Sequence, residues 1–127
     1  MNAADLPRLS VLLALAATTA VNAAFLVADP RLGHLPPWLA AILLTGGVAY
    51  VAAIPLALRR KRAGFILAAF LGVAGAAVAV ADNLALSGST PNAATFALNV
   101  AVVALAVPMV AGSMFCLRSE NAERPPP

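Results

Sequence analysis

Four long apolar stretches account for most of this sequence. They cover about residues 9–28, 37–58, 63–86 and 92–117, and each holds about 20 residues or more with almost no charge. About 20 apolar residues are enough for a helix to cross the hydrocarbon core of a bilayer. Charged residues make up only 10% of the chain, whereas soluble domains carry roughly 25%. The sequence therefore predicts an all-α, polytopic membrane protein, a four-transmembrane-helix bundle that forms one domain over residues 1–117.

The basic residues predict the orientation of these helices. Half of the eight Lys and Arg residues form one tetrad between the second and third stretches: Arg59, Arg60, Lys61 and Arg62. If the N-terminus is cytoplasmic, only Arg31 lies outside, and the tetrad shares the inner side with Arg8, Arg118 and Arg124. Short cytoplasmic loops are enriched in such residues. We expect a multi-pass protein of the cell membrane with both termini cytoplasmic, and a tetrad placed to bind anionic lipid headgroups.

The two ends of the chain need separate interpretation. Arg8, the apolar run after it and the small residues at 21–23 also have the pattern of a secretory signal peptide. The apolar run continues to Val27, however, which favours an uncleaved first helix. Residues 118–127 are polar and end in three prolines, so we expect a disordered cytoplasmic tail.

The two halves of the sequence share a sparse pattern. A shift of 53 positions aligns Asp29 with Asp82 and Pro55 with Pro108. The match predicts two like-oriented helical hairpins related by duplication; chance agreement in an Ala-rich chain is the alternative. Each proline removes one backbone hydrogen bond and should kink its helix, either as a gating hinge or as ordinary curvature.

Small residues mark one helix for close packing. In the third stretch they recur every four residues, with a further glycine beside them: Gly64, Ala68, Gly72, Ala76 and Gly75. Such small-xxx-small patterns let the backbones of membrane helices approach closely. The ridge predicts packing inside the monomer or, alternatively, a dimerisation face.

Few polar residues lie within the apolar stretches. Two sets each share a helical face: Thr18, Asn22 and Asp29 in the first stretch, and Asn92, Thr95 and Asn99 in the fourth. At 1.5 Å of rise per residue, Asn22 and Asn99 both lie about 10 Å inside the outer end, so we expect their amides to meet. They would form structural hydrogen bonds between helices or, alternatively, floor an outward-facing polar pocket rimmed by Asp29 and Asp82. A proton or cation site at Asp82 is a further hypothesis.

Motifs for catalysis are lacking, so we expect no enzyme activity, no cofactor and no metal site. His34 stands alone as a histidine and Cys116 as a cysteine, and the basic residues flank apolar stretches rather than forming a nucleic-acid-binding stripe. The sequence favours a non-catalytic accessory or structural subunit packed in a larger membrane complex. The alternative is a small membrane carrier or channel, either a monomer or a homodimer. Expected partners are membrane lipids, and other membrane protein subunits or a second copy of the chain.

Overall fold

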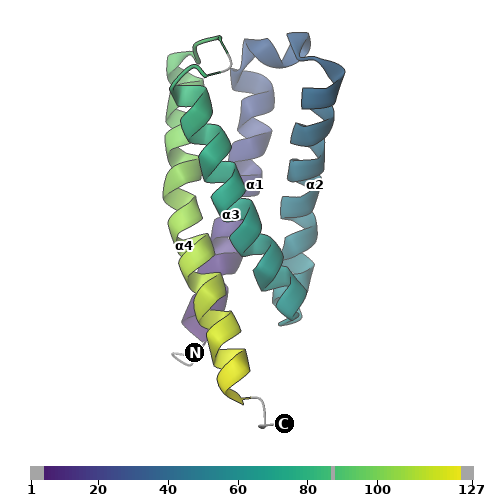
Figure 1. The fold of residues 1–127 in the computed structure, drawn as a ribbon, viewed down its shortest axis with the longest axis vertical. Helices are drawn as coiled ribbons and strands as arrows, with labels where there is room; N and C mark the ends of the chain where they lie inside the picture. The colour runs from purple at the N-terminus through teal and green to yellow at the C-terminus, as the bar shows by residue number, and fades with distance from the viewer. Residues whose placement is uncertain (1–4, 87, 124–127) are drawn as a thin grey trace.

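The structure is a computed structural model that describes residues 5–86 and 88–123. These residues form four long α-helices and one short 3-10 helix, with no strand among them (Figure 1). In chain order the elements are α1 (Leu6–Ala28), η2 (Pro30–His34), α2 (Pro37–Leu58), α3 (Arg62–Asn83) and α4 (Ala93–Glu123). All four α-helices are long and apolar enough to cross a membrane. The predictions of an all-α chain and of four such helices are confirmed.

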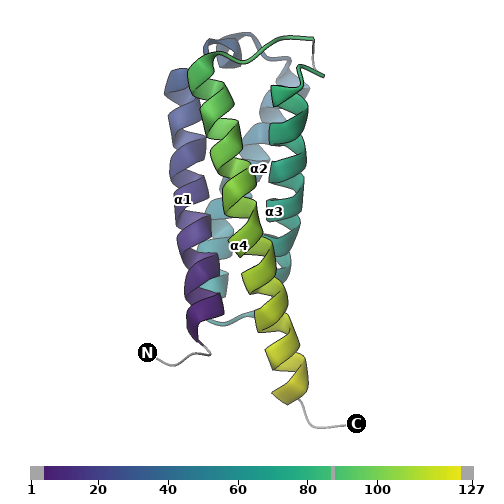
Figure 2. The ribbon, with the colours of Figure 1, turned by 90° about the vertical axis from the view of Figure 1, so that its left-hand side faces the viewer.

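The four helices lie side by side, and each packs against two neighbours. Helix α1 contacts α2 and α4, and α3 contacts the same two helices (Figures 1 and 2). At one end, which we call the η2 end, η2 and the α3–α4 connection lie together. The opposite end, which we call the terminal end, holds the start of α1, the α2–α3 turn and the last residues of α4.

Helices α2 and α3 end in the same backbone motif. At the end of α2 the Lys61 amide donates to the Leu56 carbonyl (2.9 Å) and the Arg60 amide to that of Ala57 (3.1 Å). This pair of bonds is the Schellman motif, which requires a left-handed residue just past the helix. Arg60 takes that conformation with φ 56°, and Ala85 does the same after α3 with φ 57°. Both helices are therefore stopped by backbone geometry at a residue other than glycine.

Three helix boundaries differ from those predicted from apolar runs. Helix α3 ends at Asn83 rather than 86, because residues 84–86 form its Schellman turn. Helix α1 begins earlier, at Leu6. Helix α4 continues to Glu123, so residues 118–123 are helical and not part of a disordered tail. In the sequence, position 124 precedes a proline, and a residue before proline is disfavoured in the α conformation, which fits a helix that ends at Glu123. Residues 124–127 lie outside the described residues.

The tight apolar core lies toward the terminal end. Its buried members come from all four helices and include Val11, Leu15, Ala53, Phe65 and Met109. Ala68 of the small-residue ridge of α3 is part of this core. Close helix packing therefore holds together the half of the molecule near the terminal end.

The glycines of the α3 ridge lie against the neighbouring helices. A Cβ added to Gly64 would lie 2.6 Å from the backbone nitrogen of Ala57 in α2. One added to Gly72 would lie 2.7 Å from Val110 of α4. One added to Gly75 would collide with the hydroxyl of Tyr50, which donates to the Leu71 carbonyl at 2.9 Å. Ala68 is buried and Ala76 partly buried. The ridge packs inside the chain, so Gly64, Ala68 and Gly72 offer no surface to a second copy.

Helix α2 packs internally only along its second half. Its buried residues are Tyr50, Ala53 and Ala57, and none of residues 37–49 is buried. A Cβ added to Gly46 or Gly47 would meet no atom within 4 Å. The half of α2 nearer the η2 end therefore contributes little to the core.

Both helix-internal prolines lie in continuous helices. Pro55 is inside α2 and Pro108 inside α4. Each lacks the N–H that would donate to the carbonyl four residues back, which is why a kink is expected there. The kinks stay a prediction. The duplication of the two hairpins also stays a prediction.

Candidate functional site

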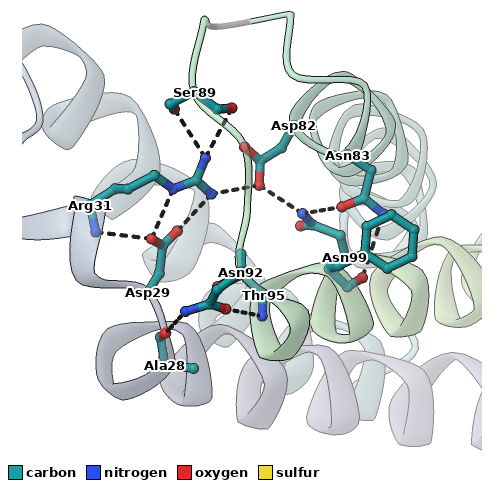
Figure 3. A network of polar contacts seen from close by, with 10 residues as sticks. Ala28, Asp29, Arg31, Asp82, Asn83, Ser89, Asn92, Thr95 and Asn99 are labelled. Atoms are coloured by element: carbon teal, nitrogen blue, oxygen red, sulfur yellow. Dashed lines mark hydrogen bonds and ion pairs between the residues drawn. The ribbon is translucent and has the colours of Figure 1, made fainter.

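Arg31 is the centre of a polar cluster at the η2 end (Figure 3). It lies in η2, just after α1, and its guanidinium binds the Asp29 carboxylate through Nε–Oδ1 and Nη2–Oδ2 distances of 3.0 Å each. The same Nη2 donates to Asp82 of α3 at 3.0 Å, and Nη1 donates to the Ser89 hydroxyl at 3.1 Å. One side chain thus joins the end of α1, the end of α3 and the α3–α4 connection. We call Asp29, Arg31, Asp82, Asn83, Ser89 and Asn99 the Arg31 cluster.

Local structure explains the position of Asp29 and Arg31. Asp29 ends α1 in an extended conformation, and its Oδ1 accepts the Arg31 amide at 3.0 Å, which caps η2. Pro30 suits the first position of such a helix because its missing N–H would have no partner there. The cap turns the Arg31 side chain back over Asp29 and across to α3.

The charges of this cluster support one another. The hydrogen bond from Arg31 holds the pKa of the Asp29 carboxyl below its ordinary value. Hydrogen bonds to Asp29 and then Asp82 raise the pKa of Arg31 above its ordinary value. Side-chain exposure is 9% for Asp29 and 23% for both Arg31 and Asp82. At these exposures water weakens the ion pairs only in part, so the cluster is a stronger link than an ordinary surface salt bridge.

Asn99 extends the cluster into α4. Its amide nitrogen donates to Asp82 Oδ2 at 2.7 Å and to Asn83 Oδ1 at 2.8 Å. Asn99 is 4% exposed, so these bonds satisfy a buried amide. The expected pairing of Asn99 with Asn22 is therefore not formed. The Asn99 side chain points toward α3, although its helix α4 also packs against α1.

A second link joins α4 to α1. Asn92 is the N-cap of α4: its Oδ1 accepts the Thr95 amide at 2.8 Å. Its Nδ2 donates to the Ala28 carbonyl at the end of α1, at 3.0 Å. Asn92 therefore caps the start of one helix and the end of another with one side chain (Figure 3).

The other predicted polar residues lie apart from the Arg31 cluster. Thr18 is buried, and its hydroxyl donates to the Ala14 carbonyl of its own helix at 2.7 Å. Asn22 is partly buried, and its side chain has no hydrogen bond within residues 5–86 and 88–123. Thr95 is fully buried, and its hydroxyl oxygen finds no partner in the described part of the chain. Within each predicted polar face, some side chains therefore form hydrogen bonds and others do not.

Sequence reasoning missed three members of the cluster: Arg31, Asn83 and Ser89. In the sequence, Arg31 stands out only as the exception to the positive-inside pattern. Arg31 follows Asp29 by two residues and is predicted at the same end of the bundle as Asp82. A lone cation near two aspartates is a signal that could have identified it. Ser89 carries no such signal, because its position depends on the path of the α3–α4 connection.

A hollow beside this cluster is lined almost entirely by apolar side chains. An open hollow of about 330 Å³ between α3 and α4 touches the cluster only at Asn83 and is otherwise lined by apolar residues: Val80, Leu84, Val100, Val103 and Ala104. In the part of the chain that the structure describes, no three His, Cys, Asp or Glu side chains are grouped as metal ligands. The place between the two carboxylates is taken by the Arg31 guanidinium. This arrangement can fasten helix ends together.

The terminal end holds the predicted lipid-binding residues. Arg59, Arg60 and Lys61 form the α2–α3 turn and are exposed, and Arg62 begins α3. Arg60 binds Asp5 at 3.2 Å. The charged residues are thus gathered at the two ends of the helices, with apolar surface between them.

Comparisons with protein-family models, with curated proteins and with solved structures found no match for this chain.

Proposed function

We propose that this chain is an integral protein of the cell membrane, a multi-pass four-helix bundle, and that it serves as a non-catalytic accessory or structural subunit of a larger membrane complex. Four helices of spanning length and composition support the membrane location. The terminal end carries Arg8, the basic tetrad and Arg118, and the η2 end carries Arg31, which supports cytoplasmic termini. In sealed cells, a Lys61→Cys variant labelled by an impermeant thiol reagent from outside would contradict this orientation.

The subunit role is supported mainly by one observation: the polar side chains of the Arg31 cluster form their hydrogen bonds and ion pairs with one another. The guanidinium is bonded to Asp29, Asp82 and Ser89, and the buried Asn99 amide to Asp82 and Asn83. A substrate at this end would have to replace these bonds with its own. The cluster is better suited to keep the helix ends in fixed positions, which a packing subunit requires.

The outer half of α2 supports a lateral contact with another subunit. Large apolar side chains there face outward, among them Trp38 (65% exposed) and Leu44 (69% exposed). Gly46 and Gly47 have open space where a side chain would lie. Small residues let a second membrane helix come close, where dispersion contacts between backbones stabilise the pair. The proposal assigns this half of α2 to a spanning helix of a different subunit.

Purification in a mild detergent with mass spectrometry tests the role. The tagged full chain should bring down larger membrane subunits at fixed stoichiometry. A Gly46→Leu/Gly47→Leu variant should lose them while keeping the helical content and at least the melting temperature of wild type, because a Cβ at either position meets no atom within 4 Å. An Ala77→Leu variant on the exposed face of α3 is the matched control and should keep the partners. A chain that purifies alone, or a variant that keeps the wild-type partners, would contradict the proposal.

A small carrier or channel is the second candidate, and one observation favours it. The Thr95 hydroxyl is buried one helical turn from Asn99 and has no partner among the described residues, and buried polar groups without a partner are rare in native proteins. This candidate predicts that Asp82→Asn and Asn99→Ala preserve the fold but abolish ion or solute flux into liposomes containing the chain. Flux equal to that of empty liposomes would eliminate it.

A further inference from the structure

The α2–α3 turn is built entirely from cations. Helix α2 ends at Leu58 and α3 begins at Arg62, so the connection is Arg59, Arg60 and Lys61, all exposed. The first turn of α3 contains no acidic residue. The turn therefore concentrates positive charge at the end of two apolar helices, where few carboxylates oppose it.

Arg60 has a different role from its two neighbours. It sits at the left-handed position of the Schellman motif with φ 56°, a conformation that favours glycine. Its guanidinium reaches the Asp5 carboxylate, with an Nη2–Oδ1 distance of 3.2 Å, and so ties the turn to the segment before α1. Arg8 adds to this link by donating to the Leu58 carbonyl at 3.4 Å. The Arg60 side chain is thus exposed but paired with Asp5 of the same chain.

Arg59 and Lys61 flank this anchored residue. Backbone hydrogen bonds fix both residues: the Lys61 amide donates to the Leu56 carbonyl at 2.9 Å in the Schellman motif, and the Arg59 amide donates to the Pro55 carbonyl at 3.1 Å as the last helical bond of α2. The N-terminal amides of α3 follow directly, and Lys61, as its N-cap residue, makes no capping bond to them through its side chain. The turn thus presents two cations together with the positive end of a helix dipole.

We propose that Arg59 and Lys61 bind the phosphate group of an anionic phospholipid in the leaflet that surrounds the terminal end. This inference requires the membrane location proposed above, but not the subunit role. Helix α2 ends at Leu58 and α3 begins at Arg62, so in a membrane the turn between them lies at headgroup depth. Zwitterionic lipids also carry a phosphate, but their ammonium group opposes binding to a cationic turn. The net charge of the headgroup is therefore what the turn selects.

Lipid retention in native mass spectrometry tests this assignment. The full chain is purified in detergent, mixed with equal amounts of phosphatidylglycerol and phosphatidylcholine, and the ratio of the two bound lipids is measured. Each basic residue near a membrane surface strengthens the attraction to anionic lipid about fivefold. Arg59→Gln and Lys61→Gln should each lower the ratio about fivefold, and the double variant about thirtyfold. An unchanged ratio in the double variant would overturn the inference.

A charge-matched control separates the site from net charge. Asp5→Asn/Arg60→Gln removes one cation and one anion, so the net charge of the chain is preserved, and the ratio should stay within about twofold of wild type. If this control loses the preference as fully as Arg59→Gln/Lys61→Gln, the assignment to those two residues is wrong. Excess inorganic phosphate should not displace the lipid; displacement would assign the turn to free phosphate instead.

Flotation with vesicles of pure phosphatidylcholine separates this inference from the membrane proposal. Wild type and Arg59→Gln/Lys61→Gln should both insert into these vesicles and float with them. Wild type that fails to float would contradict membrane insertion itself. Flotation of both proteins, combined with equal lipid ratios, would contradict only the anionic-lipid site.

Discussion

Replacing Arg31 by methionine tests whether one guanidinium holds the η2 end together. Methionine keeps an unbranched side chain but cannot donate a hydrogen bond. The substitution leaves the carboxylates of Asp29 and Asp82 without their shared cation. It also frees Ser89 in the α3–α4 connection. The core at the terminal end is distant and should keep its packing, so the effect isolates the Arg31 cluster.

The expected magnitude follows from the geometry of the bonds. Arg31 donates to Asp29 and Asp82 at 3.0 Å and to the Ser89 hydroxyl at 3.1 Å. Hydrogen bonds to charged groups contribute about 1.5–3 kcal/mol when they are shielded from water. With Arg31 and Asp82 each 23% exposed, water recovers part of that loss. We expect Arg31→Met to lower the free energy of unfolding by about 2–3 kcal/mol.

Arg31→Lys gives a graded comparison. Lysine keeps the positive charge but lacks the planar fork that reaches two carboxylates at once. Its cost should be about 1 kcal/mol. Arg31→Met combined with Asp82→Asn closes a double-mutant cycle, and we expect a coupling of about 1–2 kcal/mol because the two side chains are in direct contact.

Reversible unfolding in mixed detergent micelles, followed by circular dichroism, measures these differences. Arg118→Met is the control, since Arg118 is an exposed residue of α4, and its effect should stay within about 0.5 kcal/mol. If Arg31→Met costs no more than Arg118→Met, or if the cycle shows no coupling, the cluster does not hold the η2 end and the reasoning fails.

Two further predictions concern acid and packing. The pKa of Asp29 is lowered in the folded chain from an ordinary value of 3.8, so its stabilising effect is complete above that value and is lost as the pH falls through the lower, folded pKa. Melting in detergent from about pH 6 to pH 3 should show a loss of stability below about pH 4 that is smaller in Asp29→Asn; equal losses in both would contradict the pairing. Gly64→Ala should cost about 2–3 kcal/mol because its Cβ meets the backbone of α2. Gly46→Ala, which meets nothing within 4 Å, should be neutral or up to about 1 kcal/mol stabilising, and equal effects of the two changes would refute this packing.

Much of the fold could be predicted because it depends on local properties of the chain. A run of apolar residues carries its own signal for a helix, and Pro37 and the basic tetrad mark both ends of α2 where the structure has them. The ends of α3 and α4 were harder. An apolar run does not reveal a Schellman turn, and a polar segment such as 118–123 can continue a helix as well as leave it.

The partners of the polar residues could not be predicted in this way. Depth along a helix placed Asn22 and Asn99 at one level, yet depth says nothing of the direction in which a side chain points. Asn99 points to Asp82 and Asn83 of α3. The rotation of each helix about its axis is set by the packing of all four, and a single stretch of sequence does not contain that information.

The sequence by itself determined the number of helices, their composition and the gathering of charge at their ends, because these follow from the solubility of each segment. Only the tertiary structure decided that Arg31, which binds Asp29 beside it, also binds Asp82, 51 residues further along the chain. The physical reason is that an ion pair depends on distances of about 3 Å, and those distances exist only after the helices have packed and the connections have closed.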